Sequence, residues 1–210
     1  MSSEAVLYGD PETRRRILQA TWELLEQQGA GVKLVDVADR AGVSRQAVYL
    51  HFGDRSGLLV ALVDFIDVSL GAVQLRAHIH GGATGVESLQ RWIQTMSWYT
   101  AKIDRVTQVL ESSQYQDEAL AAAWRDRMDR RQQHIRSIVE RIAAEGGLAE
   151  GWSVDAAVDL IYVVTMPGAW RELTRELGWT GEQYTQNLTR LVQAALLKGV
   201  TAASRPNKDT

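Results

Sequence analysis

The chain has no cysteine and only three prolines among its 210 residues. The absence of cysteine excludes disulfide bonds and thiolate metal sites, and it is typical of a reducing cytosol. No apolar run reaches the ~18 residues of a membrane span. The first ten residues, MSSEAVLYGD, lack the basic and apolar regions of a secretion signal. We therefore expect a cytoplasmic protein that does not contact a membrane.

Strand-like alternation of apolar and polar residues is also missing. Hydrophobic residues make up 45% of the chain, which is too much for a disordered protein. The length suits one or two compact domains. Apolar residues recur at helical spacing, for example in the stripe Leu120, Trp124, Met128, Ile135, Ile138 and Ile142. The sequence predicts an all-α fold of about nine helices.

Glycine, proline and capping residues set the expected ends of these helices. The predicted helices cover about 11–28, 34–41, 45–50, 55–76, 86–103, 105–112, 117–145, 154–177 and 182–198. Pro167 falls inside the eighth, where we expect a kink or a break because proline removes a backbone hydrogen bond. Residues 1–10 and 201–210 are expected to be flexible tails.

The segment Asp36–Phe52, DVADRAGVSRQAVYLHF, has the pattern of two short helices joined by a tight turn. Gly42 stands where the first helix ends and suits the left-handed conformation found there. Ser44 is a good cap for the second helix, although Ala47 stands where a full capping box has Glu or Gln. Val48 faces inward. Two helices joined by a glycine-containing turn are typical of a helix-turn-helix, whose second helix reads the DNA major groove.

The same segment resembles the DNA-binding head of the TetR (tetracycline-repressor-like) family. The resemblance is strong over residues 11–60 and weaker over 167–197, and its motifs are Val37-Ala38, Ala41-Gly42-Val43-Ser44, Tyr49 and His51-Phe52. The chain departs from the family pattern in three places. Lys33 replaces a capping threonine, Arg45-Gln46 replaces a smaller pair, and Arg55-Ser56-Gly57 replaces a Lys-Glu pair. These departures affect the expected base and phosphate contacts more than the fold.

The resemblance implies a three-helix helix-turn-helix head over residues 11–55 and a ligand-binding and dimerisation body over 56–200. It implies a homodimeric, sequence-specific transcriptional regulator of the bacterial cytosol, associated with the nucleoid. We expect a repressor that a small apolar or aromatic ligand releases from a palindromic operator. An activator or a ligand-independent regulator is an open alternative. So is an all-helical enzyme or protein-interaction module with an incidental helix-turn-helix corner.

Candidate contacts with double-stranded DNA lie on and beside the second helix of the motif. Arg45 and Gln46 occupy its first turn, and their side chains pair well with guanine and adenine edges. The other candidates are placed to contact phosphate directly or through helix N-terminal N–H groups; they are Lys33, Ser44, Tyr49, His51 and Arg55. The net charge is −3, and residues 11–55 carry seven Arg or Lys and six Asp or Glu. We therefore expect a single head to bind weakly and to depend on a dimer.

The body holds most of the large aromatic side chains. Core packing accounts for any one of them, but as a set they indicate an apolar cavity between helices. The predicted pocket residues are Trp98, Trp124, Met128, Tyr162 and Met166. The last two predicted helices carry broad apolar faces, which a second copy of the chain can cover in a four-helix bundle. The predicted dimer contacts are Val158, Ile161, Leu188, Leu191, Val192 and Ala195.

Metal and catalytic sites are not expected. His78 and His80 would point about 200° apart on a helix, and no set of carboxylates near them completes a metal site. No nucleophile–base pair and no phosphate-binding glycine loop is evident. We expect no cofactor and no enzymatic activity.

Overall fold

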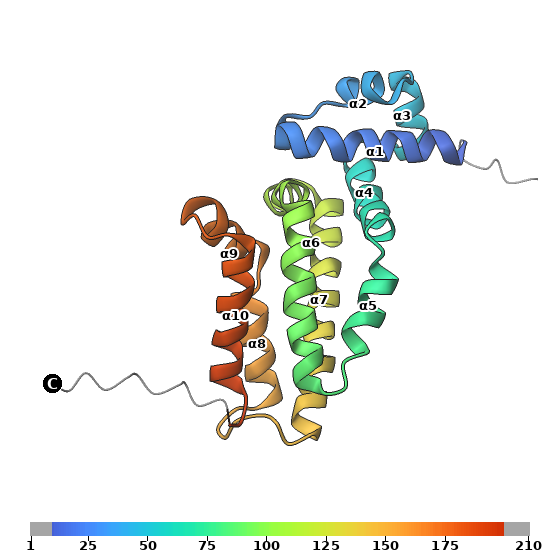
Figure 1. The fold of residues 1–210 in the computed structure, drawn as a ribbon. Coiled ribbons are helices and arrows are strands. Elements are labelled where there is room, and N and C mark those ends of the chain that lie inside the picture. Colours follow the sequence, from blue (N-terminus) through green and yellow to red (C-terminus); the bar gives the residue numbers. More distant parts are fainter. Residues whose placement is uncertain (1–9, 200–210) are drawn as a thin grey trace, which may run out of the picture. The chain divides into compact units, whose positions relative to one another are not determined.

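The structure, a computed structural model, describes residues 10–199. The tails predicted at 1–10 and 201–210 lie almost wholly outside the described residues. Residues 10–199 are helical apart from turns and connections, with a single isolated β-bridge between Leu148 and Leu197. The all-α prediction is confirmed. The α-helices are α1 (Pro11–Gln28), α2 (Leu34–Ala41), α3 (Arg45–Phe52), α4 (Arg55–Ser69), α5 (Ala72–His80), α6 (Gly85–Ser113), α7 (Glu118–Ala144), α8 (Val154–Val164), α9 (Pro167–Arg171) and α10 (Gly181–Leu196) (Figure 1).

Three predicted helices differ from the observed ones. The helix expected over 55–76 is interrupted at Leu70 and Gly71, where Gly71 has a φ of +72°. The helices expected over 86–103 and 105–112 form one continuous α6, because Asp104 between them does not break a helix. The expected break at Pro167 is present, since α8 ends at Val164 and Pro167 begins α9. A π-helical turn, Glu172–Glu176, follows α9.

The chain divides into two compact units. The N-terminal unit comprises the chain up to Ala72 together with Ile103–Asp126. In it α1 lies across α2 and α3 (Figure 1). The second unit comprises Val73–Lys102 and the chain from Arg127 onward. Helices α6 and α7 therefore contribute residues to both units.

The second unit is built around a large apolar core. Its buried side chains come from α5, α6, α7, α8, α9 and α10, and α8 packs beside α10 (Figure 1). At one end of this core, Gly85 lies so close to α7 that a Cβ atom there would stand 2.8 Å from the backbone nitrogen of Ile142. Glycine is required at this position because the two backbones touch.

No single helix among the described residues has both the length and the hydropathy to cross a membrane. The pair Arg55–Ser69 and Ala72–His80 meets those criteria only jointly.

Candidate nucleic-acid interface and effector cavity

The turn between α2 and α3 has the geometry that its sequence predicts. Gly42 adopts a left-handed conformation with φ +66° and ψ +39°. The N–H of Val43 donates to the carbonyl oxygen of Ala38 at 3.0 Å, which closes the end of α2. Ser44 caps α3, because its hydroxyl oxygen accepts from the N–H of Ala47 at 3.1 Å. Val48 is only 1% exposed and anchors α3 to the core of the head.

The outward face of α3 presents Arg45 and Gln46, which are expected to contact bases, and Tyr49, which is expected to contact phosphate. All three side chains are exposed. The guanidinium of Arg45 donates to the Tyr49 hydroxyl at 3.0 Å and lies 5.4 Å from the centre of its ring. These contacts hold Arg45 along the helix surface. Leu50, which the sequence analysis did not select, is 64% exposed beside Tyr49.

The predicted phosphate contacts fall into two groups. Lys33 and Ser44 are exposed at the N-terminal ends of α2 and α3. His51 and Arg55 are half-buried. The Nδ1 atom of His51 is buried, and Arg55 donates to the carbonyl oxygen of Ala30 at 3.4 Å. Arg55 is thus turned toward the α1–α2 connection rather than extended into solvent.

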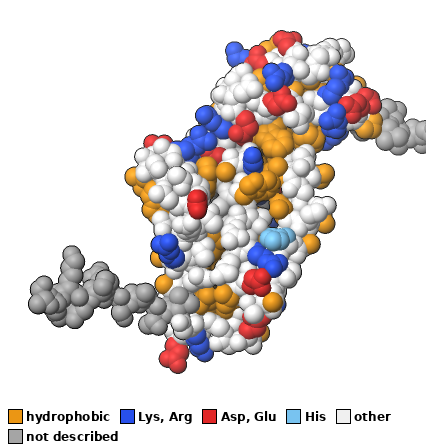
Figure 2. All heavy atoms as spheres, in the orientation of Figure 1, with side chains coloured by type: hydrophobic (Ala, Val, Ile, Leu, Met, Phe, Trp, Pro, Cys, Tyr) orange, Lys and Arg blue, Asp and Glu red, His pale blue; other side chains and the backbone are white. Residues whose placement is uncertain are grey.

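The arginine cluster at the start of α1 is engaged within the head. Arg14 donates to the carbonyl oxygen of His51 at 3.0 Å, and Arg16 donates to that of Ala41 at 3.3 Å. Both acceptors lie in the last turns of their helices, where carbonyl groups need partners. Arg15 pairs with Glu12 at 2.7 Å on the surface. On the face shown in Figure 2, basic and acidic side chains are interspersed over the head.

The start of α4 is tied to the turn between α6 and α7 inside the N-terminal unit. Asp54 caps α4 by accepting from the N–H of Gly57 at 2.8 Å. The hydroxyl of Ser56 donates to one carboxylate oxygen of Asp117, and the N–H of Leu120 donates to the other at 3.0 Å. These hydrogen bonds, first that of Ser56, lower the pKa of Asp117 from its usual value. The carboxylate therefore joins α4 to α7 while it caps α7.

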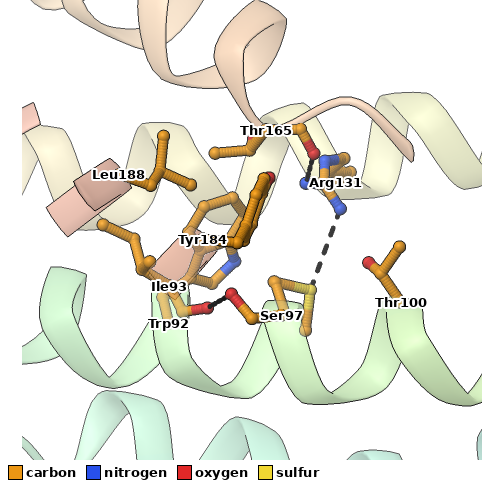
Figure 3. A pocket seen from close by; sticks show the side chains of 9 residues that line it. Trp92, Ile93, Ser97, Thr100, Arg131, Thr165, Tyr184 and Leu188 are labelled. Carbon is orange, nitrogen blue, oxygen red and sulfur yellow. Dashed lines mark hydrogen bonds between the residues drawn. The ribbon is translucent and has the colours of Figure 1, made fainter. Parts of the chain in front are cut away.

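A small cavity lies between α6, α7 and α10 in the second unit (Figure 3). Its free volume is ≈10 Å³, about the room that one water molecule needs. The wall combines aromatic, aliphatic and hydroxyl side chains with one guanidinium. It is formed by Trp92, Ile93, Met96, Ser97, Thr100, Arg131, Thr165, Tyr184 and Leu188.

An open groove of ≈450 Å³ lies between α6 and the start of α10. Ser97 lines both the groove and the small cavity, and Trp98, 45% exposed, lines the groove. Its remaining walls are polar or small and come from Gln94, Ala101, Gly181, Glu182, Thr185 and Gln186.

The five predicted pocket residues do not lie around one common cavity. Trp98 lines the groove, and none of the five lines the small cavity. Met128 is buried on α7, while Tyr162 and Met166 are half-buried at the end of α8 and just after it. Trp124 is buried in the N-terminal unit. Trp124 and Met128 are thus buried, and the role of all five residues in ligand binding stays a prediction.

Arg131 is the cavity residue that the sequence analysis missed, although a signal was present. The buried stripe of α7 continues from Met128 to Ile135 and Ile138, and all three are buried. Position 131 falls on this stripe at the expected spacing of three and four residues. A charged residue at an apolar position of an amphipathic helix indicates a buried cation.

The predicted dimer contacts differ in how exposed they are within the single chain. Val158, Ile161, Leu188 and Val192 are at most 7% exposed within the single chain. These four side chains pack in the core of the single chain, and their contact with a second copy stays a prediction. Ala195 is half-buried, and Leu191 is 54% exposed. Val163 of α8, 62% exposed, is a further outward apolar side chain on this helix pair.

Among the described residues, no group of three or more His, Asp or Glu side chains is arranged to hold a metal ion. His80 instead packs edge-on against His134 of α7, with ring centres 5.9 Å apart. Burial lowers the pKa of His134 from its usual value, and the neighbouring His80 and Arg76 lower it further.

Residues 17–62 match the sequence model of the bacterial regulatory proteins, tetR family. The helix-turn-helix transcriptional regulator YdeS of Bacillus subtilis, itself uncharacterized, is 25% identical over 198 residues, which is 93% of each chain. A protein of Saccharomonospora viridis, solved in complex with choline, superposes with a TM-score of 0.79. It is 19% identical, and the match covers 90% of this chain and 100% of that one. The regulator FadR of B. subtilis, solved with stearoyl-CoA, gives a TM-score of 0.69 at 18% identity, covering 84% and 96%.

Proposed function

Because the chain belongs to the TetR family of transcriptional regulators, we propose that it is a homodimeric repressor of the bacterial cytosol. In this proposal it binds a palindromic operator, and a small molecule bound in the second unit releases it. The observation that carries the proposal is the outward face of α3. Arg45, Gln46 and Tyr49 are exposed together on a helix whose opposite side is anchored by Val48. Arginine and glutamine in the first turn of a recognition helix suit direct reading of base edges.

The weak charge of the head supports a dimer. Arg14 and Arg16 donate to helix-end carbonyls, while Arg15 and Arg40 pair with Glu12 and Glu23. This leaves few basic groups for phosphate, so one head has little electrostatic affinity. A two-fold pair doubles the contacts and matches a palindrome. The exposed Val163 and Leu191 supply apolar surface for such a pair.

The effector part of the proposal is supported by the cavity and the groove of the second unit. Both are concave surfaces between helices, which is where helical proteins hold small ligands. Two proteins of the same fold were solved with bound small molecules, choline in one and stearoyl-CoA in the other. The Ser56–Asp117 contact supplies a physical connection between the start of α4 and the α6–α7 turn.

DNA binding and regulation are tested in one series of measurements. Fluorescence anisotropy with DNA from upstream of the protein's own coding region should show saturable binding that a scrambled duplex of equal length competes for poorly. The Arg45→Ala variant should lose this preference. Arg40→Ala is the matched control, because Arg40 pairs with Glu23 at 2.6 Å. Equal affinity of the wild-type protein for both duplexes, tested across a genomic library, would contradict sequence-specific regulation.

Repression is tested with a reporter placed behind the bound DNA. Deletion of the protein should raise reporter expression, whereas an activator would give a fall. A regulator without an effector would keep its operator affinity in the presence of every compound that binds the second unit.

A further inference from the structure

Arg131 is a cation held inside the second unit without an acidic partner. No carboxylate among the described residues forms an ion pair with it, and its electrostatic neighbours are Tyr184, Arg127 and Tyr162. The residue is half-buried as a whole, but its Nε atom is shielded from solvent and has no hydrogen-bond acceptor. A buried charge without a counter-charge is costly, and proteins normally provide a partner.

The remaining contacts of the guanidinium leave its charge uncompensated. One terminal nitrogen donates to the carbonyl oxygen of Thr165, and the other lies 3.9 Å from the sulfur of Met96 (Figure 3). Its central carbon lies 5.1 Å from the centre of the Trp92 ring. These partners are neutral. Burial lowers the pKa of Arg131 to about 10, so it remains charged at neutral pH.

The surroundings of Arg131 add to the preference for an anion. Arg127 is close enough to lower the pKa of Arg131 further, and it donates to the Tyr99 hydroxyl at 2.8 Å. Burial raises the pKa of Tyr184 to about 12, so its hydroxyl stays neutral and adds no negative charge. The potential in the cavity is therefore positive, and a cationic ligand is disfavoured.

The unpaired Nε–H of Arg131 favours a carboxylate as the bound anion. This N–H is a charged donor available to one carboxylate oxygen. The terminal nitrogen on the same edge of the guanidinium donates to Thr165 and carries a second N–H for the other oxygen. Trp92, Tyr184, Ile93 and Leu188 form an apolar wall around the same space. The free volume of ≈10 Å³ requires side chains to move when a ligand enters. Met96, unbranched and flexible, is suited to such movement.

We infer that Arg131 anchors the carboxylate of a small organic acid whose apolar body packs against Trp92 and Tyr184, and that this acid is the effector. The inference rests on the proposed function for its regulatory part and on the cavity alone for its binding part. The apolar body of the acid is either aromatic or aliphatic.

Matched acid and amide pairs test the binding part. The probes are benzoate, phenylacetate, cinnamate, hexanoate and octanoate, each with its primary amide, and choline as a cation of similar size. Melting temperature and calorimetric affinity are measured for the full chain. At least one acid should raise the melting temperature of the wild-type protein, while its amide and choline should not. Aromatic and aliphatic members of the set distinguish the two kinds of body.

Arg131→Met removes the charge and keeps an apolar side chain of similar length. It should weaken binding of the acid by about 30-fold or more, which corresponds to the loss of one partner of a buried charge pair. Arg136→Met is the matched control on the same helix, because Arg136 pairs with Asp155 at 2.7 Å outside the cavity. It should bind the acid like the wild-type protein. If Arg131→Met does not fold, Arg131→Gln serves in its place, since it keeps a donor and removes the charge.

Three results would overturn the inference: no acid of the panel raises the melting temperature, the amides act as strongly as the acids, or the Arg131 variant keeps its affinity. Operator binding is measured separately with the same acids. An acid that binds through Arg131 but leaves DNA affinity unchanged would preserve the binding site and remove its role as effector site. Absence of DNA binding by the unliganded protein would count against the proposed function instead.

Discussion

Arg14 donates from its guanidinium to the carbonyl oxygen of His51 at 3.0 Å, and the same group lies 4.5 Å from the centre of the Phe52 ring. One side chain of α1 therefore holds the last turn of α3 by a hydrogen bond and a cation–π contact. Arg14 thus helps to orient α3, although it contacts neither Ser44 at the start of that helix nor its outward face.

Arg14→Ala should destabilise the head by about 1–3 kcal/mol, because it leaves a helix-end carbonyl without its charged donor. Urea unfolding followed by circular dichroism measures the change. Arg15→Ala is the control, since the exposed Arg15–Glu12 pair contributes at most about 1 kcal/mol. Equal losses in the two variants would show that the contact with His51 has no special role.

Arg45→Ala should weaken operator binding by about 1–3 kcal/mol and relax specificity at one base pair. Its contact with Tyr49 in the DNA-free chain must break for the side chain to reach a base. Tyr49→Phe removes the hydroxyl that accepts this bond and tests whether the bond affects DNA binding by Arg45. Anisotropy titrations against single-base operator variants measure both effects, and an unchanged base preference in Arg45→Ala would refute direct readout by this residue.

Lys33→Ala should weaken binding to all duplexes and reduce the slope of log affinity against log salt concentration by about one. Arg55→Ala should have the same effect if Arg55 leaves the carbonyl of Ala30 to reach phosphate. Titrations at several salt concentrations measure the slopes. A slope that differs from wild type in Lys33→Ala but not in Arg55→Ala would assign Arg55 to holding the α1–α2 connection.

In the proposed dimer, Leu191→Glu should raise the dissociation constant by at least about tenfold, because like charges would meet at the interface between the two copies. Light scattering coupled to gel filtration measures the mass. Val68→Glu is the control, since Val68 is 80% exposed on α4 and lies outside the proposed interface. A Leu191→Glu protein that keeps its wild-type mass would place the interface elsewhere.

Stability should fall as the solution is acidified below neutral pH, in part through His134. Burial, His80 and Arg76 lower its folded-state pKa, so between that value and about 6.5 the unfolded chain binds more protons. The contribution of His134 is fully present above about pH 6.5 and is lost as the pH falls to its folded-state value. Urea unfolding at several pH values should show a shallower decline in His134→Gln. Identical pH profiles would exclude His134 as a source of the decline.

The head was predictable because short-range rules govern it. Gly42, Ser44 and Asp54 adopt the turn and capping roles that their residue types favour. The end of α2 and the starts of α3 and α4 follow directly from these three residues. Helix identity in the body was also predictable from apolar spacing. The position of the cavity was not predictable from the sequence, because tertiary packing decides which helix each apolar stripe faces. Trp92 and Trp98 have the same chemistry and differ only in which side of α6 they occupy.

The close approach of Gly85 to the backbone of Ile142 fixes the spacing between the start of α6 and the end of α7. A Cβ atom at position 85 would stand 2.8 Å from the backbone nitrogen of Ile142, so even alanine would force these two helix ends apart. Position 85 does not line the small cavity. A substitution there is therefore expected to change how α6 and α7 pack without replacing any residue of the cavity wall.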